Sequence, residues 1–556
     1  MAFEDVLAEV GDFGWYQKRL CYFFQFPVSL VMAWISMPTY FMLATPDHWC
    51  YVPQLSNFSL EIQKKLIRPP KANNPNRLDS CRMYDIDYNI FLNNSASVLF
   101  FNKSSENITT KACDNGWTFD PSDYESTAVT ELNLYCDRSI WISNIFTCHS
   151  IGMVVGTWLY GRHKAFYLTV LTSLISCSSP ILFRSLYLVA LFRFMNGLVL
   201  PSIFHLPYLI LKFLFQNLLL VTEIVGPSKR AFIMGIDGGL WALGISILPL
   251  VVYLSRNWVN LNIINFIVTA MIFLGWRLLP ESPRWLLAEG RHSELYKTLA
   301  NIARVNGRKE PANLKAKVNE LIKEHAESGE KNVSSWDFFT KPGLRKNFLL
   351  ITFSIVAEDS AYYGLALNFE NLEGNTFLNF FMLAVVEIPS SILTWYIIET
   401  RLGRRWSNSI LLTFGGVLLC IPIMLSSQHG TAITVLSIFA KFVTNTALLI
   451  TYQQAAELYP TSLRNQGIGI NVAAGCIVTL MLPYLSHLGR DNVLIPLTTI
   501  GVACVLSGVA STFLPETLNQ NLPQEVYEAQ QFGKGQKFFS LATKPSKSKV
   551  NVLLDT

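Results

Sequence analysis

The sequence predicts an all-α polytopic membrane protein built from two similar halves. Its 556 residues are 51% hydrophobic and only 15% charged, with a mean hydropathy of +0.31, whereas a soluble chain usually carries roughly 25% charged residues. The apolar residues collect in about twelve runs of about twenty residues, the length at which a helix crosses ~30 Å of hydrocarbon. Since these runs do not alternate between polar and apolar residues, they favour helices over the strands of a barrel.

The apolar runs fall on both sides of one long polar interruption. Those before it lie near residues 20–43, 139–159, 165–183, 186–221, 231–254 and 257–279, and those after it lie near 347–367, 375–398, 408–427, 431–453, 466–487 and 492–514.

One set of loop motifs recurs in the same order in both halves. Segments 161–164, 223–230 and 280–287 in the first half correspond to 403–405, 457–464 and 515–518 in the second, at nearly constant offset. Such internal repetition in a membrane protein is typical of a carrier whose substrate site lies between the halves.

Basic residues in the short loops predict the orientation in the membrane. Loops bearing Arg162, Arg230 and Arg404 should face the cytoplasm, which places both termini there. The expected division is a cytoplasmic N-terminus 1–19, a first bundle 20–279, a cytoplasmic linker 280–346, a second bundle 347–514 and a cytoplasmic tail 515–556.

The long polar segment 44–138 should then lie outside the cell. It carries four glycosylation sequons, which only that side could use, and four cysteines, an even number suited to an oxidising compartment. Four cysteines allow three pairings, and the sequence does not choose among them. A further sequon at Asn332 falls in the expected cytoplasmic linker and should stay unmodified. The sequons in the loop are Asn57, Asn93, Asn102 and Asn107, and the cysteines are Cys50, Cys81, Cys113 and Cys136.

The repeated motifs place acids and bases together at the inner ends of helices. Ion pairs that form only when the inner face is closed would bias an equilibrium between two states, although any single residue could serve only topology or helix capping. The candidate gating residues are Arg162, Glu223, Arg230, Glu281 and Arg284 in the first half, and Glu399, Arg401, Arg404, Arg405, Glu457, Arg464 and Glu516 in the second.

Charged residues inside the spans are candidate substrate-binding groups. Glu358 and Asp359 are adjacent in the seventh span, and since neighbours point about 100° apart on a helix, at most one should face a cavity. Glu358 could balance a cation or couple a proton, or it could pair internally with Lys441. The other candidates are Glu387, Cys476 and the aromatic residues Trp241, Tyr362, Tyr363 and Tyr452, whose rings attract ammonium groups.

Other functions lack their motifs in the sequence. It contains neither a Gly-x-x-x-x-Gly-Lys-[Ser/Thr] loop for ATP nor the His-x-x-x-His or Gly-x-Ser-x-Gly patterns of metal-dependent and nucleophilic enzymes. We therefore expect neither an enzyme nor a bound cofactor or metal. The net charge of +5 does not argue for nucleic acid. The expected partners are the lipid bilayer, a small organic ion and, in a coupled mechanism, Na+ or H+.

Several of these motifs resemble a known family. Segments 280–287, 457–465, 362–365 and 387–389, together with the cysteine-bearing loop after the first span, look like the organic cation, anion and zwitterion transporters. This is solute carrier family 22 of the major facilitator superfamily. The resemblance implies twelve helices in two six-helix bundles, alternating access, and movement of small organic ions across the plasma membrane.

The chain departs from the family pattern at three places. Thr157 stands where the second half has Glu399, and the fourth span is longer by about two helical turns around 211–220. At Cys476 the cation transporters of the family carry Asp and the anion transporters carry Arg. Cys476 is neither, so it does not indicate the sign of the substrate charge. Because Lys441 could receive a carboxylate while Glu358 receives an amine, a zwitterionic amine similar to carnitine, carcinine or β-alanine fits best, and an ordinary cation is next. An organic anion, or a receptor or scaffold that no longer transports, remains an alternative.

Overall fold

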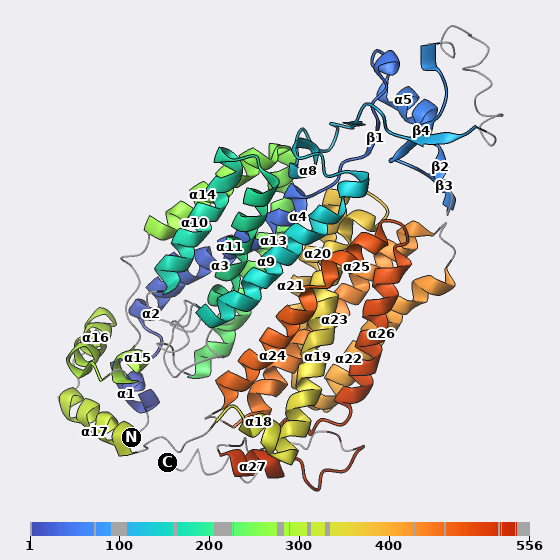
Figure 1. Cartoon of the computed structure of the whole chain (residues 1–556). Coiled ribbons are helices and arrows are strands. Elements are labelled where there is room, and N and C mark those ends of the chain that lie inside the picture. Colours follow the sequence, from blue (N-terminus) through green and yellow to red (C-terminus); the bar gives the residue numbers. More distant parts are fainter. Residues whose placement is uncertain are drawn as a thin grey trace.

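The computed structural model describes residues 3–71, 74–89, 108–159, 165–204, 225, 227–274, 283–288, 290–308, 313–327, 334–425, 429–460, 463–520, 523, 525–539 and 541. Its long helices form two bundles that lie side by side, one from each half of the chain (Figure 1). The prediction of a two-bundle helical membrane protein is confirmed.

The first bundle holds the first six predicted spans. The first span is a broken helix, made of α2 (Trp15–Leu20), a π-helical turn (Cys21–Gln25), α3 (Phe26–Ser36) and α4 (Pro38–Met42). The others are α9 (Ile140–Leu159), α10 (Ala165–Leu182), α11 (Leu186–Phe204), α13 (Pro227–Ser255) and α14 (Trp258–Leu274).

The second bundle holds the other six. It consists of α19 (Pro342–Leu367), the pair α20 (Thr376–Val385) and α21 (Glu387–Ile398), α22 (Gly403–Cys420), α23 (Gly430–Leu458), the pair α24 (Arg464–Thr479) and α25 (Leu482–Gly489), and α26 (Leu494–Ser511). Pro38, Pro389 and Pro483 lie in the first turn of the last piece of each broken span. Proline is tolerated there because the first backbone N–H groups of a helix have no partner within it.

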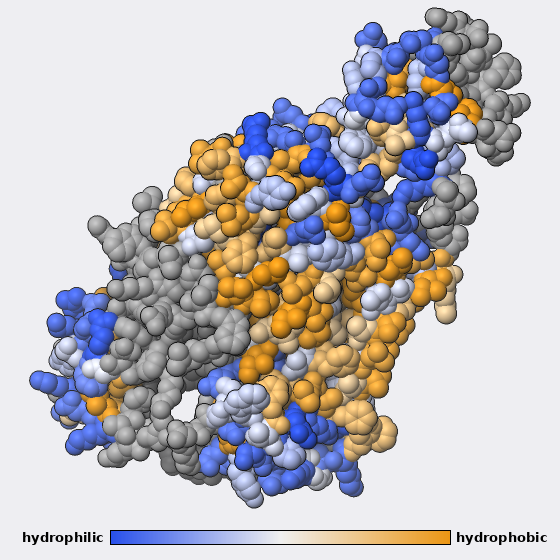
Figure 2. Space-filling view, viewed as in Figure 1, coloured by the Kyte–Doolittle hydropathy of each residue, from blue (hydrophilic) through white to orange (hydrophobic). Residues whose placement is uncertain are grey.

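Within the described residues, 8 helices or helix pairs are long and apolar enough to cross a membrane, and shorter apolar helices lie at Leu186–Val199 and Trp258–Met271. The helices α10 and α19 fall where the third and seventh spans are predicted. On the face that Figure 2 shows, apolar side chains gather over the middle of the bundles and hydrophilic ones toward both ends. Of the two irregular segments, 157–164 and 211–220, residues 160–164 and the whole of 211–220 lie outside the described residues.

The segment after the first span forms a small subdomain at one end of the bundles. We call this end of the bundles the loop face. It contains β1 (His48–Cys50), a 3-10 turn (Pro53–Leu55), α5 (Leu60–Ile67), β2 (Pro70–Lys71), β3 (Asn74–Leu78), β4 (Arg82–Tyr84), β5 (Thr110–Ala112) and β6 (Trp117–Phe119). The strands pair antiparallel as β1–β6, β2–β3 and β4–β5. The short α8 (Ala128–Glu131) and a 3-10 turn (Cys136–Arg138) lead into α9.

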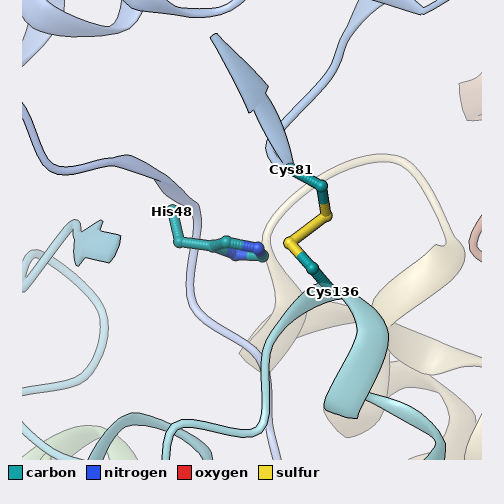
Figure 3. Close-up of side chains that lie close together, drawn as sticks. All are labelled: His48, Cys81 and Cys136. Atoms are coloured by element: carbon teal, nitrogen blue, oxygen red, sulfur yellow. A yellow bond between two sulfur atoms is a disulfide. The ribbon is translucent and has the colours of Figure 1, made fainter. Parts of the chain in front are cut away.

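The structure selects one of the three possible disulfide pairings, Cys50–Cys113 and Cys81–Cys136. The second disulfide lies beside the ring of His48 (Figure 3). The Nδ1 atom of this ring lies 3.0 Å from the carbonyl of Pro46. Because both sulfur atoms are bonded to each other, this trio does not offer the thiolates that a metal site would require.

The opposite end of the bundles, which we call the linker face, carries short helices that lie outside the predicted spans. They are α15 (Pro283–Ala288), α16 (His292–Val305), α17 (Leu314–Glu327), α18 (Asp337–Thr340) and, after the last span, α27 (Val526–Gln531). The N-terminal helix α1 (Phe3–Val10) packs its apolar side onto α16 and α17. The Asn306 amide fixes this junction, donating to the carbonyl of Gly11 and accepting from the N–H of Tyr16.

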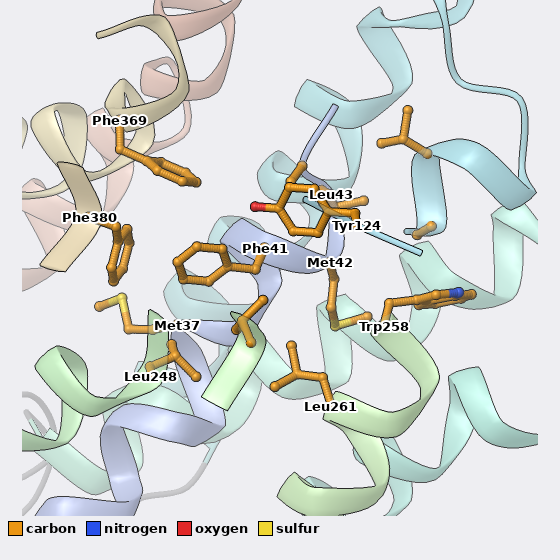
Figure 4. Close-up of a cluster of buried hydrophobic side chains, with 14 of the residues drawn as sticks. Met37, Phe41, Met42, Leu43, Tyr124, Leu248, Trp258, Leu261, Phe369 and Phe380 are labelled. Atoms are coloured by element: carbon orange, nitrogen blue, oxygen red, sulfur yellow. The ribbon is translucent and has the colours of Figure 1, made fainter. Parts of the chain in front are cut away.

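A cluster of aromatic residues joins the two bundles at the loop face (Figure 4). Phe41 from the first span packs against Phe369 and Phe380 of the second bundle, with ring centroids 5.3 Å and 4.8 Å apart. Since these rings are buried, the bundles are in close contact at this end.

Candidate functional site

Two adjoining cavities lie between the bundles. The inner cavity has about 490 Å³ of empty space and the outer cavity about 440 Å³, both including space open to solvent. The walls of both contain Tyr40, Phe146, Leu367 and Pro483. The outer cavity extends to the loop-face residues Glu370 and Arg490, so the two cavities follow one another along the seam between the halves.

The inner cavity is largely apolar, with a few polar side chains from both bundles. Its wall includes His149 and Ser150 on α9, Thr39 on α4, Tyr363 on α19 and Thr479 on α24. A concave, mostly apolar site with a few convergent polar groups is typical of small-molecule binding.

The two adjacent acids of α19 occupy different environments. Glu358 is 1% exposed and accepts a hydrogen bond from the Thr451 hydroxyl at 2.7 Å, so it points into the second bundle. Asp359 lies near Tyr363, Tyr452 and Cys476. Tyr363 is a wall residue of the inner cavity. Of the two acids, Asp359 is therefore the one that lies near a wall residue of the inner cavity.

Asp359 is held close to a neighbouring helix. A Cβ atom built on Gly475 would lie 2.1 Å from the Asp359 Oδ2 atom, so glycine at this position lets the carboxylate approach α24. Within the described part of the chain, Asp359 has neither a hydrogen-bond nor an ion-pair partner. A buried carboxylate without a basic partner is costly in a membrane protein and is a candidate for function.

Lys441 pairs with Glu387 and not with Glu358, contrary to the internal pairing considered from the sequence. Its Nζ atom lies 3.3 Å from Glu387 Oε1, donates to the carbonyl of Tyr362 at 3.0 Å and sits 3.4 Å from the centre of that ring. The Tyr362 hydroxyl donates to Glu387 Oε2 at 3.2 Å. It accepts from Trp241 of the first bundle, also at 3.2 Å. This network joins four of the predicted residues and connects the bundles.

Hydrogen bonds also join the bundles toward the loop face. The hydroxyls of Ser143 and Thr147 on α9 donate to the carbonyls of Pro483 and Leu480 at 3.0 Å and 3.3 Å. Arg490 donates to the Thr45 hydroxyl at 3.1 Å. With the aromatic cluster of Figure 4, these contacts close the loop face.

At the linker face, the acids and bases of the second half lie together. Arg404 contacts Glu457 at 3.2 Å and the mostly exposed Glu399 at 3.6 Å. The Arg464 guanidinium lies 3.5 Å from the Tyr459 carbonyl and interacts electrostatically with Glu457.

Glu516 has a different role from the side-chain ion pair expected. Its carboxylate accepts from the backbone N–H groups of Arg404 and Arg405 at 2.9 Å and 3.1 Å, so it caps α22. An acid there satisfies free donors and complements the helix dipole. Gly403 has a φ of +67°, and a Cβ on it would lie 2.3 Å from Glu516, so both the turn and the cap require glycine.

The tail returns to this cap. The side chain of Gln536 bonds both to the N–H and to the carbonyl of Glu516, at 2.9 Å and 3.0 Å. Phe538 and Phe539 then pack against Trp406, with ring centroids 6.1 Å and 6.2 Å away. The tail thus covers the beginning of α22.

Some predicted residues remain without a structural account. Arg401 is exposed and has no ion-pair partner among the described residues. Seven predicted residues lie outside the described part: Arg162, Glu223, Glu281, Asn93, Asn102, Asn107 and Asn332. The side chains of Arg230 and Arg284 also lie outside it.

Apart from Tyr363, the sequence analysis did not propose the polar groups of the cavities as binding residues. Glu370 and Arg490 stand in connections between spans, where charge is ordinary, so no pattern singled them out. A lone histidine in a span, such as His149, is more often a packing residue than a functional one, yet His149 lies in the wall of the inner cavity. Whether His149 packs inside the bundle or faces the cavity depends on the rotation of α9 about its axis, which the sequence does not fix.

The comparisons with known proteins agree with this arrangement. The model of the sugar (and other) transporter family matches residues 83–527. The carcinine transporter of Drosophila melanogaster is 31% identical, over 96% of this chain and 80% of that one. The beta-alanine transporter of the same species is also 31% identical, over 95% and 89%. The human organic cation/carnitine transporter 2 is 26% identical, over 94% and 93%.

Solved structures show the same fold. The proton:xylose symporter XylE bound to 6-bromo-6-deoxy-D-glucose superposes with a TM-score of 0.53 at 14% identity, covering 91% of this chain and 98% of that one. The inward open xylose transporter XylE from E. coli gives 0.51 at 15% identity, covering 74% and 92%. Two helical bundles around a shared cavity thus define a carrier of the major facilitator superfamily. The chain belongs to the sugar (and other) transporter family and, within it, to the organic cation, anion and zwitterion transporters of solute carrier family 22.

Proposed function

We propose that the protein is a secondary transporter of small organic cations and zwitterionic amines, which bind in the inner cavity and cross by alternating access. The observation that carries this proposal is Asp359, a buried carboxylate beside the cavity without a basic partner among the described residues. An ammonium group would supply the missing counter-charge, and the rings of Tyr363 and Tyr452 beside it would attract the same group. The names of the carcinine, beta-alanine and organic cation relatives support this class of substrate.

The test is an uptake panel in cells expressing the full chain. Labelled amines, zwitterions and carboxylates of similar size would be supplied separately, at two external pH values and with or without Na+. Saturable accumulation of amines above that of control cells is expected, and the pH and Na+ arms identify the coupling ion. Uptake confined to carboxylates would assign the protein to organic anions, while binding without accumulation would assign it to a receptor.

An anion is the weaker candidate because of Lys441. This lysine is the cationic side chain among the predicted binding residues, and Glu387 already neutralises it at 3.3 Å. A carboxylate substrate would have to displace Glu387 from a buried ion pair, and breaking such a pair costs several kcal/mol, on the order of 3–5.

We further propose that the loop face is extracellular at the plasma membrane and that both termini are cytoplasmic. Asn57, which lies in the loop-face subdomain, is exposed. Treatment with an N-glycosidase should therefore lower the apparent mass of the mature protein, and Asn57→Gln should remove part of that change. Asn332→Gln should leave the glycosylation pattern unaltered. Sugar on Asn332 would reverse the orientation.

External pH should act through Glu370, the acid of the outer cavity. Burial raises the pKa of Glu370 to about 7, against the opposing effects of Arg490 and the Thr45 N–H. Tyr124 and the outer-cavity residue His487 also face this region. If opening the loop face exposes Glu370, its pKa falls toward the ordinary value of about 4.3. The closed form then binds more protons, so its stability relative to the open form falls as pH rises from about 4.3 to about 7 and levels off above that.

The expected result is a Michaelis constant for external amine that decreases as external pH is raised from about 6 to about 8. Glu370→Gln should flatten this dependence, because glutamine does not titrate. Glu373→Gln, which changes an exposed acid in the same connection, is the matched control and should keep the wild-type profile. Identical pH profiles for wild type and Glu370→Gln would show that another group is responsible.

A further inference from the structure

His149 offers a hydrogen-bond acceptor to the inner cavity. Its Nδ1 atom lies 3.2 Å from the backbone carbonyl of Arg193. Since a carbonyl oxygen can only accept, Nδ1 must carry the proton, and the neutral ring then keeps a lone pair on Nε2. His149 is partly exposed and lies in the cavity wall, so Nε2 is the polar atom of this ring left for a ligand.

The position of the His149 ring is fixed by its hydrogen bond to Arg193, whose own side chain is held in place. Arg193 is 3% exposed and donates to the Thr39 hydroxyl at 2.9 Å and to the Asn262 amide oxygen at 3.3 Å. These contacts attach α11 to α4 and α14 and hold the carbonyl that orients His149. A ligating or binding histidine is commonly oriented in this way, through a hydrogen bond from its other nitrogen.

The hydroxyl groups near His149 also offer acceptors. The Ser150 hydroxyl donates its proton to the carbonyl of Phe146 at 3.2 Å, and the Thr479 hydroxyl donates to the carbonyl of Cys476 at 2.7 Å. Each therefore has only lone pairs left for a ligand. His149, Ser150 and Thr479 thus suit a ligand group that donates hydrogen bonds.

We propose that His149 is a specificity-determining residue, which accepts a hydrogen bond from a second N–H group of the substrate while Asp359 binds its ammonium group. This inference rests on the proposed function and narrows it to amines with a donor at both ends. Asp359 lies one helical turn from Tyr363 on α19, and His149 faces the same cavity from α9 of the other bundle. The two ends of one substrate would therefore connect the two halves of the carrier.

Two amines of similar size separate the roles. Histamine carries a primary ammonium group and an imidazole N–H, whereas phenethylamine carries the same ammonium group without the second donor. His149→Phe should raise the Michaelis constant for histamine roughly three- to tenfold, the contribution of one hydrogen bond. The same change should leave the Michaelis constant for phenethylamine within about twofold. His149→Gln, which restores an acceptor near the position of Nε2, should recover most of the histamine affinity.

The outcomes are distinguishable. Surface labelling of each variant corrects for loss of folded protein, and a purely structural role would change uptake of both amines equally. An equal effect on both, or a failure of glutamine to improve on phenylalanine, overturns the role of His149 and leaves the proposed function standing. If wild-type protein accumulates neither amine nor any other cation, the proposed function fails and this inference fails with it.

Discussion

Asp359→Asn should reduce the affinity for organic cations by roughly 30- to 1,000-fold, because removing one member of a buried charge pair costs about 2–4 kcal/mol. In the wild type, substrate binding would give the carboxylate the counter-charge that no described side chain provides. In the variant the ammonium group would lose its hydration in a largely apolar cavity without gaining a negative counter-charge. The effect should appear in the Michaelis constant for uptake and in the concentration of unlabelled amine needed for competition.

Glu358→Gln is the matched control, one residue away on the same helix. Glu358 accepts from Thr451 inside the second bundle, and the glutamine amide oxygen can accept the same bond. We expect cation affinity to change by less than about threefold. The sequence alone favours Glu358 for the counter-charge role. If Glu358→Gln abolishes uptake while Asp359→Asn does not, the sequence-based assignment is right and the geometric one is wrong.

Lys441→Met should destabilise the folded protein by about 3–5 kcal/mol, because it leaves the carboxylate of Glu387 buried without its cation. The side chains of this pair are 2% and 6% exposed. The double variant Lys441→Met/Glu387→Gln should recover most of this loss, since replacing both partners removes the uncompensated charge. The measurement is the apparent Tm of the detergent-purified protein, followed as the monodisperse fraction after heating.

Lys346→Met provides the control for that experiment. Lys346 is exposed near the beginning of α19, and its replacement should leave the apparent Tm close to that of the wild type. A double variant as unstable as the single one would mean that Lys441 stabilises the fold mainly through the Tyr362 carbonyl and ring, which it also contacts.

The spans could be predicted from the sequence because hydrocarbon thickness sets their length and lipid excludes unsatisfied backbone groups. The interior charges could be recognised for a related reason, since their placement is costly and therefore rarely accidental. Their partners could not be predicted. Glu358 and Asp359 differ by about 100° around α19, and the choice between bundle interior and cavity depends on how far the helix is rotated.

The role of Glu516 is a second case in which the sequence predicts the charged residue but not the group that it contacts. The sequence places an acid near several arginines, and a salt bridge is the natural expectation. The structure uses the backbone of Arg404 and Arg405 instead of their side chains, because Gly403 turns the chain with a positive φ and lets the carboxylate reach the helix end. Motif spacing alone does not reveal that turn.

The contact of Gln536, Phe538 and Phe539 with the beginning of α22 has a practical consequence for anyone who expresses this protein. Truncating the chain so that it ends before Gln536 would remove the two hydrogen bonds from Gln536 to the backbone of Glu516. It would also remove the rings that pack against Trp406. Affinity tags and fluorescent fusions should therefore be attached beyond Phe539 and should not replace residues 536–539.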